Sequence, residues 1–83
     1  MFYAYILKSK KNGRYYIGAS EDPERRLKEH NSGKTKSTKP FIPYEIIYKE
    51  TFSTYTEARK RELYIKKRKS RRFIEEIACQ SVI

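Results

Sequence analysis

From Phe2 to Leu7, six consecutive residues of the chain are apolar or aromatic. Both alternating faces of such a segment are hydrophobic, which is typical of a central β-strand covered on both sides. No apolar run in the sequence approaches the roughly 20 residues that a membrane-spanning helix needs. We therefore expect a small sheet built around this segment, and no membrane partner.

Turn and capping signals indicate the elements that follow. Asn12-Gly13 marks a hairpin turn. Asp22-Pro23 is typical of a helix start, because Asp is a good N-cap and proline fits the first helical position. Thr54-x-x-Glu57 matches a capping box that opens a second helix. The expected elements are strands over 2–7, 14–18 and 44–49, helices over 23–30 and 55–69, and a last helix after Ser70.

These elements predict an α/β protein of the α+β type, with a small three-stranded antiparallel sheet flanked by helices in the order ββαβαα. With 83 residues and no internal repeat or linker, we expect one domain over 1–83. Cys79 is the only cysteine and His30 the only histidine, which excludes a disulfide scaffold and a four-ligand zinc site. The N-terminus has no signal-peptide pattern, so we expect a cytoplasmic protein.

A formal net charge of +10 indicates a polyanionic partner, or a solvated face that keeps the protein soluble. Within residues 51–83, every basic residue lies between Arg59 and Arg72, with Glu62 as the only acid among them. A smaller basic run, from Lys34 to Lys39, is interleaved with the hydroxyls of Thr35, Ser37 and Thr38, which suit phosphate contacts. The predicted nucleic-acid-binding residues are Lys34, Lys36, Lys39, Arg59, Lys66 and Lys67.

Glu62 is unusual because it lies on the stripe of its helix that should face the core. Ala58, Glu62 and Ile65 are spaced i, i+4 and i+7. A buried carboxylate without a partner is costly. Two partners suit it: an ion pair with Lys66 or Arg59, or a divalent cation, Mg²⁺ or Mn²⁺, that phosphate oxygens also bind.

Tyr5 and Tyr16 point to the same face of the hairpin in any unbulged register that pairs even with odd positions. A tight turn at Asn12-Gly13 would put Tyr5 opposite Ser20, so a wider loop or a bulge is needed to bring the two rings together. Both tyrosines could instead be ordinary core aromatics.

Arg26 and His30 are four residues apart and share a face of the first helix, beside Leu27, which can anchor that helix on the sheet. A guanidinium held against the protein body offers a planar fork of donors to a phosphate. The alternative is a surface arginine paired with Asp22.

The ordered set of Tyr3-Ala4-Tyr5, Tyr16-Ile17-Gly18, Arg26, His30 and Glu62 resembles the signature of the GIY-YIG nuclease family. The resemblance spans about residues 2–69 and is strongest to small stand-alone bacterial members related to the nuclease domain of a DNA-repair excinuclease. The first motif lacks the initial Gly and the Ile of the family pattern but keeps its final tyrosine as Tyr5.

This resemblance implies a metal-dependent endonuclease that hydrolyses phosphodiester bonds in DNA rather than RNA, in repair or recombination. Glu62 would hold one divalent metal ion, Mg²⁺ or Mn²⁺, and Arg26 would neutralise charge that develops on the phosphate. Tyr5 or Tyr16 would take a proton from the attacking water, and His30 would bind phosphate, relay a proton or orient Tyr16.

Two other functions remain open at this point. The first is a non-catalytic nucleic-acid-binding domain on the same fold. The second is a component of a larger repair complex, with the helix over 73–78 as its contact surface. For that helix we favour ordinary core packing, because its apolar residues form one stripe.

Overall fold

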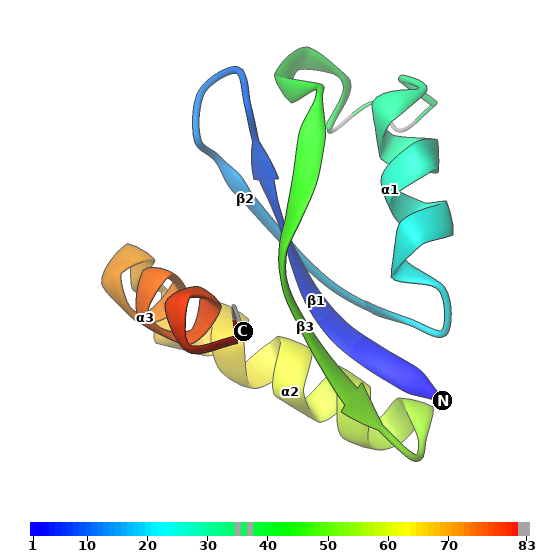
Figure 1. Ribbon diagram of the computed structural model, residues 1–83, viewed down its shortest axis with the longest axis vertical. Coiled ribbons are helices and arrows are strands. Elements are labelled where there is room, and N and C mark those ends of the chain that lie inside the picture. Colours follow the sequence, from blue (N-terminus) through cyan, green and yellow to red (C-terminus); the bar gives the residue numbers. More distant parts are fainter. Residues whose placement is uncertain (35, 37, 82–83) are drawn as a thin grey trace.

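The structure, a computed structural model, describes residues 1–34, 36 and 38–81 of the chain. Its centre is a three-stranded antiparallel sheet in the order β2-β1-β3, formed by β1 (Phe2–Ser9), β2 (Tyr15–Ser20) and β3 (Tyr44–Phe52). The first apolar segment is therefore the central strand, as its sequence predicts. Helix α1 covers one face of the twisted sheet, and helices α2 and α3 cover the other (Figure 1).

The alternation of β1 divides the core into two clusters, one on each face of the sheet. Ile6 packs on the side of α2 and α3, with Ile65 and Ile74. Tyr5 and Leu7 point the opposite way, towards the side of α1. A strand with two apolar faces thus needs helices on both sides, and the fold supplies them.

The helices begin where the sequence places their caps. Helix α1 (Pro23–Asn31) is capped by the side chain of Asp22, α2 (Tyr55–Arg68) by that of Thr54, and α3 (Arg71–Ser81) follows Ser70. The Asp22 carboxylate accepts a hydrogen bond from the backbone N–H of Arg25 at 3.1 Å, and the Ser70 hydroxyl accepts one from Phe73 at 3.1 Å. A short 3₁₀ turn (Lys39–Phe41) precedes β3. The order ββαβαα is confirmed.

The hairpin between β1 and β2 has a wider loop than a two-residue turn at Asn12-Gly13 would give. The N–H of Ser9 donates to the carbonyl of Arg14 at 2.7 Å, so four residues form the loop. Tyr5 is therefore opposite Gly18, and Leu7 is opposite Tyr16. This register places Tyr5 and Tyr16 diagonally on one face of the sheet.

Strand β3 is three residues longer than the sequence predicts, because Thr51 and Phe52 continue to pair with the start of β1. It also carries an irregularity, since Ile6 pairs with Tyr48 whereas Leu7 pairs with Ile46. The extra residue, Ile47, packs with the α2 and α3 cluster, as Tyr48 does. A bulge of this kind lets two consecutive apolar residues serve one face.

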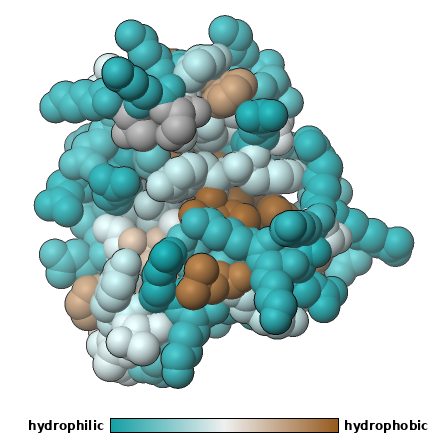
Figure 2. All heavy atoms as spheres, turned by 180° about the vertical axis from the view of Figure 1, so that it is seen from behind, coloured by the Kyte–Doolittle hydropathy of each residue, from teal (hydrophilic) through white to brown (hydrophobic). Residues whose placement is uncertain are grey.

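Helix α3 packs its apolar stripe onto the sheet, as the core-packing interpretation expects. Ile74 and Ala78 are buried, and Phe73 and Ile77 pack against them. Hydrophilic side chains cover most of the face seen in Figure 2, and hydrophobic atoms show in a limited central area. Within the described residues, no helix combines the length and the apolar character needed to cross a membrane.

Candidate active site

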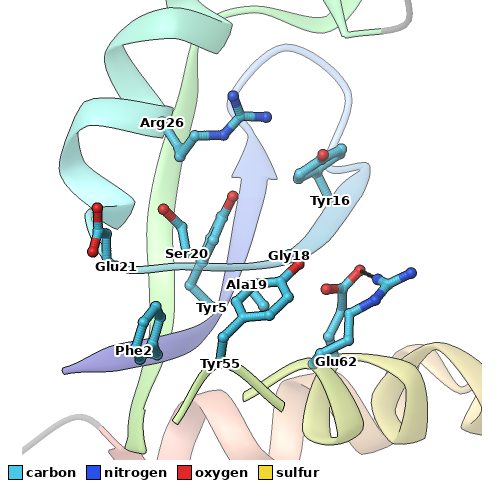
Figure 3. A pocket seen from close by; sticks show the side chains of 11 residues that line it. Phe2, Tyr5, Tyr16, Gly18, Ala19, Ser20, Glu21, Arg26, Tyr55 and Glu62 are labelled. Carbon is cyan, nitrogen blue, oxygen red and sulfur yellow. Dashed lines mark hydrogen bonds and ion pairs between the residues drawn. The ribbon is translucent and has the colours of Figure 1, made fainter. Parts of the chain in front are cut away.

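Four of the five predicted catalytic residues line one pocket at the β2 edge of the sheet. Tyr5 comes from β1, Tyr16 from β2, Arg26 from α1 and Glu62 from α2. In Figure 3 the Tyr5 side chain points towards Arg26, and Tyr16 and Glu62 stand on the other side of the same space. The fold thus brings together polar groups that are far apart in the sequence.

Tyr5 is almost fully buried, and its ring lies across Gly18 of the neighbouring strand. A Cβ atom built on Gly18 would stand 2.6 Å from the Tyr5 hydroxyl oxygen and 2.7 Å from its Cζ. The absence of a side chain at this position therefore makes room for the Tyr5 ring. Burial raises the pKa of the Tyr5 phenol, and the nearby Arg26 guanidinium opposes that rise.

Arg26 is half-buried, and its guanidinium faces two phenols and a carboxylate. The neighbouring Tyr5 phenol is the largest cause that raises the pKa of Arg26, and Glu29 and Tyr16 add to it. Its ion pair to Glu29 measures 2.7 Å. Asp22, the partner that a surface arginine would use, instead caps α1. Arg26 is thus held at the pocket as a fixed positive charge.

His30 stands behind the pocket and does not line it. Its side chain is fully buried, and its ring centroid lies 4.5 Å from that of Tyr16. The Nδ1 atom is 3.0 Å from the Thr38 hydroxyl. Burial lowers the pKa of the imidazole, and the Arg26 charge lowers it further. Thr38 is itself buried against His30, so its hydroxyl does not face solvent as the phosphate-contact hypothesis for 34–39 requires.

The Glu62 carboxylate is nearly buried, at 6% side-chain exposure, and makes both ion pairs that the sequence offers. Its Oε2 is 2.6 Å from the Arg59 guanidinium and 2.6 Å from Lys66 Nζ. Among residues 1–34, 36 and 38–81, no three acidic, histidine or cysteine side chains cluster as metal ligands. One carboxylate beside open pocket space suits a cation that takes its other ligands from water and phosphate, as Mg²⁺ does.

The predicted nucleic-acid-binding residues divide between the pocket and more distant surfaces. Arg59 lines the pocket, and Lys66 approaches it through Glu62. Lys67 lies beside Tyr64 in a separate groove of α2. Lys34, Lys36 and Lys39 are exposed on the loop after α1 and are not among the pocket-lining residues. Thr35 and Ser37, the other two predicted phosphate contacts, lie outside the described residues.

Phe2 and Tyr55 also line the pocket, although the sequence reasoning does not select them. Tyr55, Arg59 and Glu62 are spaced i, i+4 and i+7, so they lie along one stripe of α2. That spacing is visible in the sequence and could have identified Tyr55. No comparable signal marks Phe2, because it belongs to a strand that is hydrophobic on both faces.

Comparison with known proteins finds relatives along nearly the whole chain. The family described as "GIY-YIG catalytic domain" matches residues 1–75. The UPF0213 protein YazA of Bacillus subtilis is 43% identical over 76 residues, which are 87% of this chain and 76% of YazA. The UPF0213 protein of Clostridium perfringens is 37% identical over 83 residues, which are 99% of this chain and 88% of that protein.

A solved structure extends this likeness to the fold. The solution NMR structure of the UPF0213 protein BH0048 from Bacillus halodurans is similar with a TM-score of 0.56 and 36% sequence identity. The similarity covers 96% of this chain and 85% of that chain. The region that the family matches, residues 1–75, includes Tyr5, Tyr16, Arg26 and Glu62 of the pocket, and His30 behind it.

Proposed function

The chain belongs to the GIY-YIG family of nucleases, and on that premise we propose that it is a metal-dependent endonuclease that hydrolyses phosphodiester bonds in DNA. One observation carries the proposal: Tyr5, Tyr16, Arg26 and Glu62 converge on one pocket from four different elements. A module that only binds nucleic acid has no need of a buried carboxylate beside two phenols. We expect its substrate to arise during DNA repair or recombination in the cytoplasm.

Arg26 stabilises the negative charge that develops on the phosphate during hydrolysis. Its ion pair with Glu29 at 2.7 Å holds the guanidinium in place before the substrate arrives. Donors that are already oriented lower the barrier more than flexible ones, because they need no reorganisation during the reaction.

Tyr16 is the better placed of the two tyrosines to take a proton from the attacking water. Tyr5 is 1% exposed, and burial raises its pKa, so it gives up its proton reluctantly. Tyr16 is only partly buried and opens to the pocket. A phenol has an ordinary pKa near 10, so the tyrosine must lose its own proton before it can accept one from water.

His30 orients Tyr16 and does not bind phosphate in this proposal. The imidazole is fully buried, so a substrate phosphate cannot reach it without a rearrangement of the fold. Its contact with the Tyr16 ring and its Nδ1 contact with Thr38 hold both aromatic rings in place.

Glu62 would hold a single divalent ion, Mg²⁺ or Mn²⁺, which supplies Lewis-acid charge to the leaving side of the phosphate when bound. The carboxylate is already fixed by Arg59 and Lys66, so its position does not depend on the metal. Around this centre, exposed lysines and arginines hold the nucleic-acid backbone through charge, without reading bases.

The same two ion pairs support a second candidate, a non-catalytic nucleic-acid-binding domain. In that case Glu62 only neutralises two neighbouring cations on α2, and the pocket holds a phosphate without cutting the chain. Charge cannot distinguish the two functions, because a net charge of +10 favours nucleic acid in both.

The deciding experiment is the nicking of supercoiled plasmid with Mg²⁺ or Mn²⁺. Glu62→Gln and Arg26→Ala should each lower the nicking rate by about a hundredfold or more, the usual loss for a transition-state contact. Two matched controls should cut nearly as the wild type does: Arg25→Ala, an exposed neighbour of Arg26, and Glu76→Gln, an exposed carboxylate paired with Arg72.

Two results would count against the proposal. If the wild type binds but does not cut plasmid, branched DNA or RNA with either metal, the binding domain is the better description. If all variants cut at the wild-type rate, the activity comes from a contaminating nuclease and the site is misassigned.

A further inference from the structure

Two aromatic rings form part of the pocket wall, and the proposed chemistry uses neither of them. Phe2 and Tyr55 line the pocket beside Tyr5 and Glu62. Their ring centroids are 5.9 Å apart, and their planes meet at 70°, an edge-to-face contact. Tyr55 is 49% exposed. The Tyr55 ring, packed against the Phe2 ring, is therefore partly open to solvent next to the candidate catalytic groups.

Both rings are held on rigid elements. Phe2 belongs to β1 and pairs with Phe52 of β3. Tyr55 is the first residue of α2, directly after Thr54, whose hydroxyl accepts a hydrogen bond from the N–H of Glu57 at 3.2 Å. A binding group on a strand or a capped helix keeps its position better than one on a loop. The aromatic pair is thus built into the site and is not a mobile surface feature.

The pocket combines this apolar wall with a charged one. Figure 3 shows Phe2 and Tyr55 on one side, with Arg26 and Tyr16 across the space from them. Along α2, Arg59 lies four residues after Tyr55, which corresponds to about 6 Å of helix rise. A phosphate at the charged wall therefore leaves its attached or neighbouring base close to the rings.

We propose that Phe2 and Tyr55 form a nucleobase-stacking subsite, which binds the base next to the phosphate that Arg26 holds. The inference rests on the proposed function, since it takes the charged wall as a phosphate site. A base inside a duplex has both faces covered by its neighbours, whereas an unstacked base offers a free face to an aromatic side chain. The substrate class that follows is a strand with an unstacked base at the cut site, such as a single-stranded segment, an end or a bulge.

The chain provides a matched control for this subsite. Tyr64 is also on α2, is 45% exposed, and makes an edge-to-face contact with Phe73 at 5.9 Å and 78°. It lies in the separate groove with Lys67 and is not a pocket residue. Exposed tyrosines are common on protein surfaces and have no function by themselves. Comparison of Tyr55 with Tyr64 separates a general aromatic effect from one that belongs to the pocket.

The test measures binding by fluorescence anisotropy in EDTA, so that no cutting occurs. The probes are a labelled single-stranded 12-mer of DNA, the same strand with abasic sites throughout, and the blunt 12-base-pair duplex. The wild type should bind the 12-mer about tenfold more tightly than the abasic strand, within the range measured for base–aromatic stacking. Tyr55→Leu should remove this difference and leave duplex affinity unchanged, and Tyr64→Leu should change neither.

Equal affinity of the wild type for the base-bearing and abasic strands overturns the proposal, and this comparison needs no variant. Equal losses of affinity for the base-bearing strand in Tyr55→Leu and Tyr64→Leu overturn it as well. A third contradicting result is that Tyr55→Leu loses the same affinity for the abasic strand as for the base-bearing strand. The nuclease proposal is tested separately, by measuring whether the wild type nicks plasmid with Mg²⁺ or Mn²⁺.

Discussion

Tyr5 occupies the space that a side chain at position 18 would fill. The two residues are cross-strand partners in the β1–β2 ladder, and the phenol ring lies so close to Gly18 that an added Cβ would be 2.6 Å from the hydroxyl oxygen. The buried tyrosine therefore depends on a glycine opposite it. This dependence links two parts of the family signature, the first tyrosine motif and the glycine of the second, through simple steric exclusion.

Gly18→Ala should destabilise the protein by about 1–3 kcal/mol, the usual cost of overpacking. In a Tyr5→Leu background, Gly18→Ala should instead stabilise the protein, because leucine lacks the three tyrosine atoms nearest to the new Cβ. The backbone of Gly18 is not in the left-handed region, so alanine fits it and gains about 0.5–1 kcal/mol over glycine in a strand. Urea denaturation of the four proteins measures this double-mutant cycle. A destabilising alanine in both backgrounds would contradict the steric account.

The sequence predicts the shared face of Tyr5 and Tyr16 because side-chain parity holds in every register that pairs even with odd positions. It does not predict their separation, which depends on the hairpin loop. The Ser9 hydroxyl oxygen accepts hydrogen bonds from the N–H groups of Lys11 and Asn12, at 3.1 and 3.2 Å. Ser9 is itself buried against the 3₁₀ turn before β3. Contacts that are distant in sequence thus choose the four-residue loop over a two-residue turn.

Burial decides where the sequence-based expectations for the site agree with the structure and where they differ. Glu62 could be placed on a core-facing stripe because Ala58 and Ile65 define that stripe at helical spacing. Thr38 looked like part of a solvent-exposed basic run, and only the packing of α1 shows that it contacts His30. The sequence reasoning does not select Tyr55, although its spacing from Arg59 and Glu62 places it on their stripe of α2.

Protonation of His30 should weaken the fold. In the unfolded chain its imidazole takes up a proton near pH 6.5, whereas burial lowers its pKa in the folded protein. Between the two values the unfolded state binds more protons, so stability falls as the pH falls. The contribution of a neutral His30 is fully present above about pH 6.5 and is lost below it.

His30 is the only histidine, so one variant isolates this effect. His30→Gln should cost about 2 kcal/mol at pH 7.5, as a buried substitution usually does. The difference in stability between wild type and His30→Gln should then shrink as the pH is lowered to 5.5. Urea midpoints at pH 7.5, 6.5 and 5.5 measure it. A constant difference across this range would show that His30 titrates alike in both states.

Lys66 and Lys67 are neighbours that should differ in their contribution to nucleic-acid binding. Lys66 Nζ already pairs with Glu62 at 2.6 Å, whereas Lys67 is exposed and has no acidic partner within 4 Å among the described residues. Lys67→Ala should reduce the magnitude of the slope of log affinity against log salt concentration by about 0.9 on duplex DNA, one phosphate contact. Lys66→Ala should reduce it less. Binding titrations at salt concentrations from about 50 to 200 mM measure the two slopes. The slope should change more for Lys67→Ala than for Lys66→Ala.

Binding of Mn²⁺ alone should depend on Glu62 and should compete with Lys66. A cation that binds the folded protein raises its unfolding temperature by mass action. Glu62→Gln should abolish that rise, whereas Lys66→Met should strengthen Mn²⁺ binding about fivefold, because it removes a competing charge worth ~1 kcal/mol in water. The Glu62 carboxylate is nearly buried and both of its cationic partners are about half exposed, so each variant keeps most of the packing of α2.

Thermal unfolding with and without Mn²⁺ measures these effects without any nuclease activity. Glu76→Gln is the matched control, since it removes an exposed carboxylate from α3 that pairs with Arg72 at 3.3 Å. It should leave the Mn²⁺-dependent rise unchanged. If Glu62→Gln and Glu76→Gln respond to Mn²⁺ as the wild type does, the ion binds elsewhere and Glu62 serves only its ion pairs. If Lys66→Met binds Mn²⁺ more weakly, Lys66 positions the carboxylate for the metal and does not compete with it.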